Sequence, residues 1–407
     1  MGGPVPGAPD AANSTIDRQG PEAVTTPPSV VRLADLRASL HQWLDAHRAE
    51  FAAARRGAEP ASLEEAVVPE LRLQRALWEH GFTRWGWPAE CGGNGGSAVL
   101  RAAVYEQLVL DGYRIPQPML TIETLGPAMV VFSPELTASH LEACLRGDEV
   151  WCQGFSEPEA GSDLAALRCR ATAAGNDWVV SGQKLWSSLG TVSQRTAMLV
   201  RTGDAGHRGI TMLLVDLDAP GCEVRPIRAS SGRTEFAELF FDETPVGGDR
   251  VVGEVNGGWA VAMYLLQWER GMYGWMRQAV LHARLADLLG AAADPSPDDA
   301  DLVAEAWVRV SALRSSTART VQRLAVGENL GPEVSVDKVV LATAEQSVLD
   351  CERRMLPVDF SLGDEGADEV LRADWFFARM ATIYGGAIEI QRTLVAERVL
   401  GLPRSAR

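Results

Sequence analysis

Apolar residues recur at helical spacing in the first part of the chain and again in its last part. The first such series consists of Leu33, Leu36, Leu40, Leu44 and Phe51. It predicts an amphipathic helix, and the same spacing predicts helices over 63–80 and 98–111, with further helix to residue 145. Helical spacing returns after residue 258 and continues to residue 400, with a loop predicted over 291–301.

The middle of the chain follows a different pattern from about residue 148. Short runs rich in Val, Leu, Phe and Trp alternate there with Gly, Asp and Pro, which predicts a compact β domain of about a hundred residues. The predicted strands cover residues 177–181, 196–201, 210–216, 222–227 and 236–242. The order of elements is therefore α, then β, then α.

Residues 1–29 are rich in Pro, Gly, Ala, Ser and Thr and have no hydrophobic period. Such a composition buries too little apolar surface to offset the entropy of ordering, so a flexible tail is predicted. The remaining chain divides into an N-terminal helical domain over 30–147, a β domain over 148–250 and a C-terminal helical domain over 251–407. A length of 407 residues fits such a division.

The chain is acidic, with 38 Lys and Arg residues against 54 Asp and Glu residues and a net charge of −16. This balance argues against nucleic acid or an anionic membrane as the main partner, because both attract basic surfaces. No run of about eighteen apolar residues predicts a membrane span, and no secretory signal begins the chain. The six cysteines include no C-x-x-C pair, so we expect reduced thiols, a cytoplasmic location and no metal site.

Two glycine-containing strings resemble known motifs but lack essential residues. Residues 92–96 are glycine-dense, yet they match neither a phosphate-binding loop nor a dinucleotide fingerprint, and a turn is predicted. Residues 154–158 read Gly-Phe-Ser-Glu-Pro, where a serine-hydrolase elbow would require glycine in place of Pro158. A hydrolase is therefore not predicted.

Three further strings carry the chemistry of the chain. Trp-Cys-Gln-Gly-Phe-Ser-Glu-Pro-Glu-Ala-Gly-Ser-Asp at 151–163 supplies hydroxyls and backbone N–H groups suited to a polar ring edge or phosphates. Gly-Gln-Lys-Leu-Trp-Ser-Ser at 182–188 places an indole and two hydroxyls near the end of a strand. Ile-Tyr-Gly-Gly-Ala-Ile-Glu-Ile-Gln-Arg at 383–392 is followed by Ala-Glu-Arg-Val-Leu-Gly at 396–401. In this order and spacing, they resemble the acyl-CoA dehydrogenase family over about residues 30–405.

This resemblance implies an α+β multidomain fold, with a central β-barrel, a C-terminal four-helix bundle and FAD between these two domains. It also implies α,β-dehydrogenation of an acyl-CoA or acyl-carrier-protein thioester to the trans-2-enoyl product, with an electron-transfer flavoprotein as electron acceptor. The residues that it matches to flavin contacts are Gln153, Phe155, Ser156, Gly161, Ser162, Trp186, Ser188, Ala387, Ile388 and Glu389. Those that it matches to the substrate are Ser162, Gln267, Arg270, Tyr384, Gly385 and Gly386.

The reaction requires one carboxylate base. Many family members carry it immediately after the tyrosine of the closing string, where this chain has Gly385. In a second arrangement, also found in actinobacterial-type members, the base precedes an arginine on an earlier helix, and the string Leu-Leu-Gln-Trp-Glu-Arg-Gly at 265–271 places Glu269 there. Leucines lie one turn before Glu269 and Met272 one turn after, so its carboxylate falls in an apolar stripe that would raise its pKa.

Several alternatives stay open at this stage. Glu269 could pair with another helix, Arg270 could form a surface ion pair rather than reach the pantetheine arm, and Trp268 and Trp275 could belong to the core or crowd the acyl pocket. A flavin monooxygenase or nitroalkane-type oxidase on the same fold is less favoured, because a proton-abstracting glutamate fits desaturation.

The chain lacks two strings that usually hold FAD across a dimer of this family. One is R-x-x-F-G, whose arginine reaches the pyrophosphate, and the other is Q-x-x-G-G. The corresponding region instead carries Asp294, Asp298, Asp299 and Asp301, and like charges repel a diphosphate. We therefore expect weak FAD binding by this chain alone and a homo-oligomer or hetero-oligomer with a second acyl-CoA dehydrogenase-like subunit. The alternative is a degenerate or half-site subunit with little activity alone.

Overall fold

The computed structural model describes residues 32–57, 60, 62–204, 206–291, 296–363 and 366–404. The predicted tail over 1–29 and Asp294 lie outside the described residues. From Arg32 onward the chain forms one compact unit. The predicted boundaries at 147 and 250 between three domains stay predictions.

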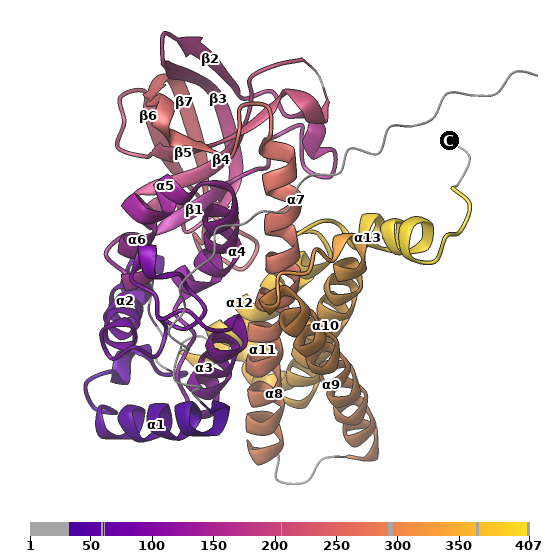
Figure 1. Ribbon diagram of the computed structural model, residues 1–407. Coiled ribbons are helices and arrows are strands. Elements are labelled where there is room, and N and C mark those ends of the chain that lie inside the picture. Colours follow the sequence, from indigo (N-terminus) through magenta and orange to yellow (C-terminus); the bar gives the residue numbers. More distant parts are fainter. Residues whose placement is uncertain are drawn as a thin grey trace, which may run out of the picture. The chain divides into compact units, whose positions relative to one another are not determined.

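The N-terminal part is helical, as the periodicity predicts (Figure 1). Its helices are α1 (Leu33–Ala46), α2 (Leu63–Glu79), α3 (Ala98–Leu110), α4 (Gln117–Phe132), α5 (Pro134–Leu136) and α6 (Glu142–Arg146), with a π-helical turn over Thr137–Leu141. Ser62 and Ser97 cap α2 and α3, since each hydroxyl accepts a backbone N–H of the first turn. Helix α1 ends before Phe51, which is buried beyond it.

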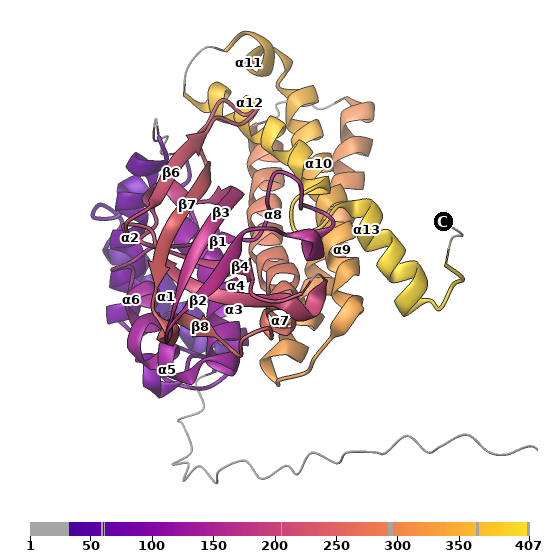
Figure 2. The ribbon, with the colours of Figure 1, turned by 90° about the horizontal axis from the view of Figure 1, so that it is seen from above.

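The central part forms one eight-stranded sheet. Its strands are β1 (Trp151–Gly154), β2 (Arg170–Ala174), β3 (Asp177–Ser188), β4 (Arg195–Arg201), β5 (Ile210–Asp216), β6 (Cys222–Ile227), β7 (Phe236–Val246) and β8 (Val251–Val252). They are ordered β6-β7-β3-β2-β4-β5-β8, with β1 parallel to β4. Figure 2 shows the sheet from above, with the C-terminal helices beside it. All five predicted strands are present as β3 to β7, and a central β domain is confirmed.

The sheet differs from the sequence prediction in two ways. Strands β1, β2 and β8 were not predicted, because they are two to five residues long and carry no alternating apolar pattern. In the part of the chain that the structure describes, β6 and β8 end the path without pairing to each other, so hydrogen bonds do not close a barrel.

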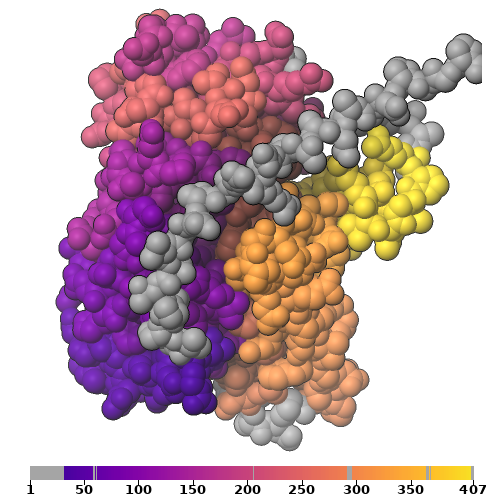
Figure 3. All heavy atoms as spheres, viewed as in Figure 1, coloured from indigo at the N-terminus to yellow at the C-terminus, as the bar shows by residue number. Residues whose placement is uncertain are grey.

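The C-terminal part is helical again, as predicted. It contains α7 (Gly258–Trp268), α8 (Gly274–Ala291), α9 (Pro297–Ala325), α10 (Ser335–Met355), α11 (Pro357–Leu362), α12 (Ala367–Arg379) and α13 (Ile388–Leu394). Helices α8, α9 and α10 contact one another, and α12 packs on α10. A π-helical turn over Val395–Val399 follows α13. The space-filling view shows this last part of the chain, in yellow, standing out from the side of the C-terminal helices (Figure 3).

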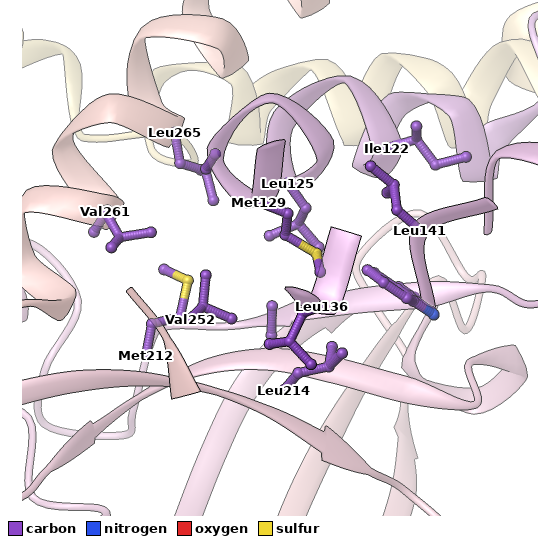
Figure 4. Packing of buried hydrophobic residues seen from close by; sticks show 14 of the residues in the cluster. Ile122, Leu125, Met129, Leu136, Leu141, Met212, Leu214, Val252, Val261 and Leu265 are labelled. Carbon is purple, nitrogen blue, oxygen red and sulfur yellow. The ribbon is translucent and has the colours of Figure 1, made fainter. Parts of the chain in front are cut away.

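One apolar cluster of the described residues joins all three parts of the chain (Figure 4). Leu125 and Met129 of α4 meet Met212 of β5, and Val261 and Leu265 of α7 close the cluster. These side chains are almost fully removed from water. Their burial fixes α7 against the sheet, and therefore fixes the segment that follows it, which starts at Glu269.

Buried polar groups connect the N-terminal helices to each other and to α8. Arg101 of α3 donates to both carboxylate oxygens of Glu123 of α4, at 2.7 and 2.9 Å, and its guanidinium lies 3.9 Å from the Trp87 ring. The Trp275 indole of α8 donates to the carbonyl oxygen of Ala102 at 2.7 Å. Trp275 therefore belongs to the core between α3 and α8, which decides one alternative left open by the sequence.

The acidic residues near 298 have a local structural role. Ser296 caps α9 in a capping box with Asp299, and Asp298 and Asp299 lie in the first helical turn, where the helix dipole favours negative charge. Arg354 of α10 pairs with Asp299 at 3.3 Å. The predicted loop over 291–301 is therefore shorter, since α9 already begins at Pro297.

Across the described residues, no helix is long and apolar enough to cross a membrane. The same residues contain no group of three or more His, Cys, Asp or Glu side chains that could hold a metal ion. All six cysteines are unpaired, and all except Cys222 are buried.

Candidate active site

Glu269 occupies a distinctive backbone position between α7 and α8. Residues Glu269–Tyr273 form a π-helical turn, which interrupts what the periodicity predicts as continuous helix. Such π-bulges are frequent at functional sites, because the extra residue re-aims neighbouring side chains. The turn packs Gly271 and Gly274 against Thr320 and Thr317 of α9, where a Cβ atom would come within 3 Å of a threonine methyl group.

The Glu269 carboxylate lies against the loop that carries the third sequence string. A Cβ atom built on Gly385 would stand 2.8 Å from Glu269 Oε1. Gly385 and Gly386 have φ values of +63° and +96°, which favour glycine, and a Cβ atom on Gly386 would overlap the Gln391 amide. The two arrangements for the family base, after the tyrosine and before the arginine, therefore converge on one place in this fold.

Three neighbours favour the ionised form of Glu269, but desolvation opposes them and has the larger effect on its pKa. Its side chain is partly accessible, but the protein packed around it removes most water, and this desolvation raises the pKa of the carboxyl. Nearby positive charges on Arg270 and Lys338 lower that pKa, as does a hydrogen bond from the Gln153 amide of β1. A carboxylate with a raised pKa is a stronger base than a solvated one.

Arg270 is the second charged group at this turn. Its Nη2 atom lies 3.8 Å from the position that a Cβ atom on Gly386 would occupy. Within the described chain its Nε atom is buried without a hydrogen-bond partner, and no carboxylate pairs with the guanidinium at ion-pair distance. A buried, unpaired donor of this kind is costly, and it fits a polar ligand group beside the Tyr384 loop.

A buried polar network holds the loop that carries Tyr384. The Lys338 ammonium of α10 donates to the Ala381 carbonyl at 2.7 Å and lies 3.8 Å from the centre of the Tyr384 ring. The Tyr384 hydroxyl donates to Glu345 at 3.1 Å, and Arg277 of α8 donates to the same carboxylate at 2.5 Å. No local pattern in the sequence links Lys338, Glu345 or Arg277 to the Tyr384 loop, and no role was predicted for them.

The first sequence string is held in place by a buried ion pair. Glu157 accepts the backbone N–H groups of Arg168 and Cys169, at 2.6 and 2.9 Å, and the Lys184 ammonium of β3 at 2.7 Å. Leu185 N also donates to the Ser156 carbonyl at 2.9 Å. Together these bonds fix the loop over 156–163 to β3, beside Trp186. Lys184, inside the second string, was the sequence signal for this contact, but no role was predicted for it.

Trp186 is held in an unusual conformation at the end of β3. Its φ is +62°, a genuine outlier for a bulky residue, and the register of β3 against β7 shifts between Lys184 and Ser187. The result is an indole that is 51% exposed at the surface of the sheet. Strained positions of this kind persist where the surrounding structure enforces them, and they cluster at binding sites.

Aromatic rings connect Trp186 to the Tyr384 loop. Trp186 contacts Phe236 of β7 edge-on, with ring centroids 5.8 Å apart, and Phe236 is parallel to Phe377 of α12 at 6.3 Å. Phe377 in turn lies 6.2 Å from the Tyr384 ring. The second and third sequence strings, which are about two hundred residues apart, thus contribute to one continuous site.

The groups around Trp186 fit a flat cofactor with polar edges. In the described structure the hydroxyls of Ser156, Ser162 and Ser188 form no hydrogen bond, and a Cβ atom on Gly161 would meet nothing within 4 Å. An accessible indole supplies a stacking surface for such a ring, and unpaired hydroxyls can bond its heteroatoms.

Two residues predicted to contact a ligand, Gln267 and Ile388, have side chains that bind or pack against other parts of the protein. The Gln267 amide donates to Asn329 at 2.7 Å and accepts the backbone N–H of Leu330 at 2.8 Å, so it holds the loop before α10. Ile388 is buried in a small cluster with Ala342 and Ala381, and Glu389 is exposed. For Gln267 and Ile388, ligand contact through the side chain would therefore require these interactions to be replaced.

Comparison with known proteins identifies the family. Residues 152–244 match the family description "Acyl-CoA dehydrogenase, middle domain", and residues 256–400 match "Acyl-CoA dehydrogenase, C-terminal domain". The chain is 36% identical to acyl-CoA dehydrogenase IpdE1 of Mycobacterium tuberculosis over 381 residues, which cover 92% of this chain and 98% of the relative. The chain belongs to the acyl-CoA dehydrogenase family. It is an acyl-CoA dehydrogenase, an oxidoreductase of the flavoprotein class, as the three strings predict.

Other acyl-CoA dehydrogenases are similar over nearly the whole chain. IpdE1 of Mycolicibacterium smegmatis is 34% identical over 399 residues, covering 93% of this chain and all of the relative. Among solved structures, the Tcur3481–Tcur3483 steroid ACAD superposes with a TM-score of 0.79 at 25% identity and covers 92% of this chain and 98% of that one. The ChsE4–ChsE5 complex of Mycobacterium tuberculosis has the same fold, with a TM-score of 0.77 at 24% identity, covering 94% of this chain and 100% of that one.

Proposed function

We propose that this acyl-CoA dehydrogenase removes the α-proton and the β-hydride of an acyl thioester, with Glu269 as the base, to give the trans-2-enoyl product. The observation that carries the proposal is the position of the Glu269 carboxylate, which is desolvated and lies directly beside the Gly385 backbone. Desolvation raises its pKa and thus its basicity, while Arg270, Lys338 and Gln153 favour its ionised form.

Substrate placement follows from the groups that surround this carboxylate. Arg270 offers a buried, unpaired Nε–H, and its Nη2 atom lies beside Gly386, which suits the thioester or pantetheine arm. Gly385 and Gly386 leave backbone without side chains next to the base, so an acyl chain can approach it closely. Tyr384 belongs to the same loop, and Ser162 would lie near the acyl-CoA. Gln267 then acts indirectly, through the loop at Asn329.

FAD is the cofactor typical of the family, and the residues near Trp186 fit its ring. When bound, it would supply the acceptor for the β-hydride. Trp186 would stack on the ring, and Ser156 and Ser188 would bond its polar edge, with Gln153, Phe155, Gly161 and Ser162 along the same loop and strand. Ala387, Ile388 and Glu389 would border the cofactor through their backbone. An electron-transfer flavoprotein as acceptor and a cytoplasmic location stay predictions.

The assignment of the base is tested by Glu269→Gln. We expect the rate of flavin reduction by a good acyl-CoA to fall by about 10²- to 10⁴-fold, with flavin content unchanged. Glu328→Gln is the matched control, since Glu328 pairs only with Arg323 at the surface. Undiminished bleaching in Glu269→Gln would refute the assignment. If the protein co-expressed with its partner subunit binds no flavin and bleaches with no acyl-CoA, the degenerate-subunit alternative holds instead.

A second subunit completes the proposal. The strings that would hold the pyrophosphate and adenosine are absent, and the structure leaves Ile390, Val399, Leu400 and Leu402 exposed at the end of the chain. Exposed apolar groups of this kind are frequent at protein interfaces. Its relative, the steroid ACAD, is named as a pair of chains. We therefore propose a hetero-oligomer and expect co-expression with an adjacent acyl-CoA dehydrogenase gene to raise flavin occupancy. Full flavin stoichiometry in the single protein would contradict this.

The acyl group is the least constrained part of the proposal. The solved relative is called a steroid ACAD, and polycyclic acyl-CoAs therefore belong in the substrate screen beside straight-chain and branched ones. Flavin bleaching by each acyl-CoA, compared at equal concentration, ranks the classes directly.

A further inference from the structure

Lysine is almost absent from this protein. Of 38 cationic Lys and Arg residues, only Lys184 and Lys338 are lysines. Both are buried, with exposed fractions of 0% and 2%. Lys184 holds the loop over 156–163 through Glu157. Lys338 lies near Glu269, the proposed base. A compact ammonium fits there, whereas a planar guanidinium would require more room.

Geometry connects Lys338 to both sides of the site. Its Nζ atom bonds the Ala381 carbonyl at 2.7 Å and lies over the Tyr384 ring, so it fixes the loop just before Gly385. Glu269 Oε1 and Lys338 Nζ both lie within 4 Å of the point where a Cβ atom on Gly385 would stand. One ammonium thus fixes the loop and places positive charge beside the carboxylate.

We propose that Lys338 is a positioning residue for the dehydrogenation, holding the Tyr384 loop against Glu269 and keeping that carboxylate ionised in its desolvated site. The inference rests on the proposed role of Glu269 as base. Lys338 touches no reacting atom in this arrangement and acts through Glu269 and the Tyr384 loop.

The charged and titratable groups that face Lys338 come from three segments. The π-helical turn contributes Glu269 and Arg270, helix α10 itself contributes Glu345, and the loop contributes the Tyr384 ring. Burial lowers the pKa of Lys338 to about 8, while Glu269 and Glu345 raise it and Arg270 lowers it further. The Glu345 charge is shared with Arg277 of α8.

The neighbouring Asp337 faces the other way. It accepts hydrogen bonds from Thr320 at 2.6 Å and from Ser316, both on α9. Asp337→Asn is therefore a matched control for a change in the same turn of α10, since it removes a buried charge without altering the group beside Glu269.

The first test measures the coupling without catalysis. Full-length protein labelled with [ε-¹³C]lysine gives only two lysine signals, and the one lost in Lys338→Arg identifies Lys338. We expect this signal to titrate near pH 8 in the wild type and at lower pH in Glu269→Gln, because the carboxylate that favours the charged amine is gone. Asp337→Asn should leave the titration in place. An unchanged titration in Glu269→Gln would overturn the proposal, whether or not Glu269 is the base.

The second test is the pH dependence of flavin reduction in Lys338→Met. Without the ammonium, Glu269 takes up its proton at higher pH, so we expect the acidic limb of the rate profile to shift to higher pH than in the wild type. The gap should close above about pH 8, where the wild-type amine also loses its charge. Lys338→Arg keeps the charge and should keep the wild-type acidic limb even if its maximum rate is lower.

The outcomes separate this inference from the proposed function. If Lys338→Met lowers the rate of flavin reduction by the same factor at every pH, Lys338 has only a packing role. The same conclusion follows if Lys338→Arg shifts the pH profile as much as Lys338→Met does. If Glu269→Gln retains full activity, the proposed base is wrong, while the lysine titration still reports whether the two groups are coupled. In a Glu269→Gln background, Lys338→Met should cause no further shift of the pH profile.

Discussion

Glu269 Oε1 stands 2.8 Å from the position that a Cβ atom on Gly385 would occupy. These residues are far apart in sequence, on the turn after α7 and on the loop before α13, and the carboxylate of the first fills the space of a side chain on the second. Glycine at 385 is thus required twice, by its φ of +63° and by this contact.

The first prediction concerns Gly385→Ala. The methyl group would displace the Glu269 carboxylate, and a shift of about 1 Å can cost roughly 10²-fold in rate. We expect flavin reduction to fall by about 10- to 100-fold. Gly175→Ala is the control, since its φ of +69° gives similar strain while nothing lies within 4 Å of its Cβ position. Equal rates in the two variants would contradict the steric argument.

The second prediction concerns pH. Glu269 acts as a base only when ionised, and burial raises the pKa of its carboxyl above 4.5. Flavin reduction should therefore rise with pH and reach half its maximum above pH 4.5, not at or below it. Stopped-flow bleaching across the acidic range measures this limb. A half-maximal rate at or below pH 4.5 would mean that the base does not have a raised pKa.

The third prediction concerns the Lys184–Glu157 pair. Lys184→Met leaves Glu157 buried without its cation, and breaking such a pair costs about 3–5 kcal/mol. We expect a corresponding loss in the free energy of unfolding by urea and weaker FAD binding, because the loop over 156–163 loses its anchor to β3. Adding Glu157→Gln should recover part of the stability. Exposed Arg225, which pairs with Glu223 at the surface, is the control, and Arg225→Met should leave the unfolding transition nearly unchanged.

The fourth prediction concerns the N-terminal helices. Arg101→Met removes the cation from Glu123, which is fully buried, and should lower the free energy of unfolding by about 3–5 kcal/mol. Arg48→Met breaks only an exposed pair with Asp45 and should change stability by less than about 1 kcal/mol. Equal effects of the two substitutions on thermal unfolding would show that burial of Glu123 adds nothing.

Local pattern predicted much of the fold. The helices α1, α2 and α3 begin where the apolar period predicts them, and β3 to β7 match the five predicted strands. These features depend on residues within one or two turns of each other, or on alternation along one strand, and the sequence contains them directly. Strands as short as β8 carry no such period and were missed.

The amino-acid sequence by itself determined the order of helical and β regions, the three strings and the choice of Glu269 as the candidate base. Only the tertiary structure decided that Gln153, Lys338 and Gly385 meet at Glu269, that Trp275 is core and that Gln267 holds a loop. The reason is physical: these contacts join segments up to about two hundred residues apart, and they arise from how the α7 cluster packs on the sheet, which no local periodicity encodes.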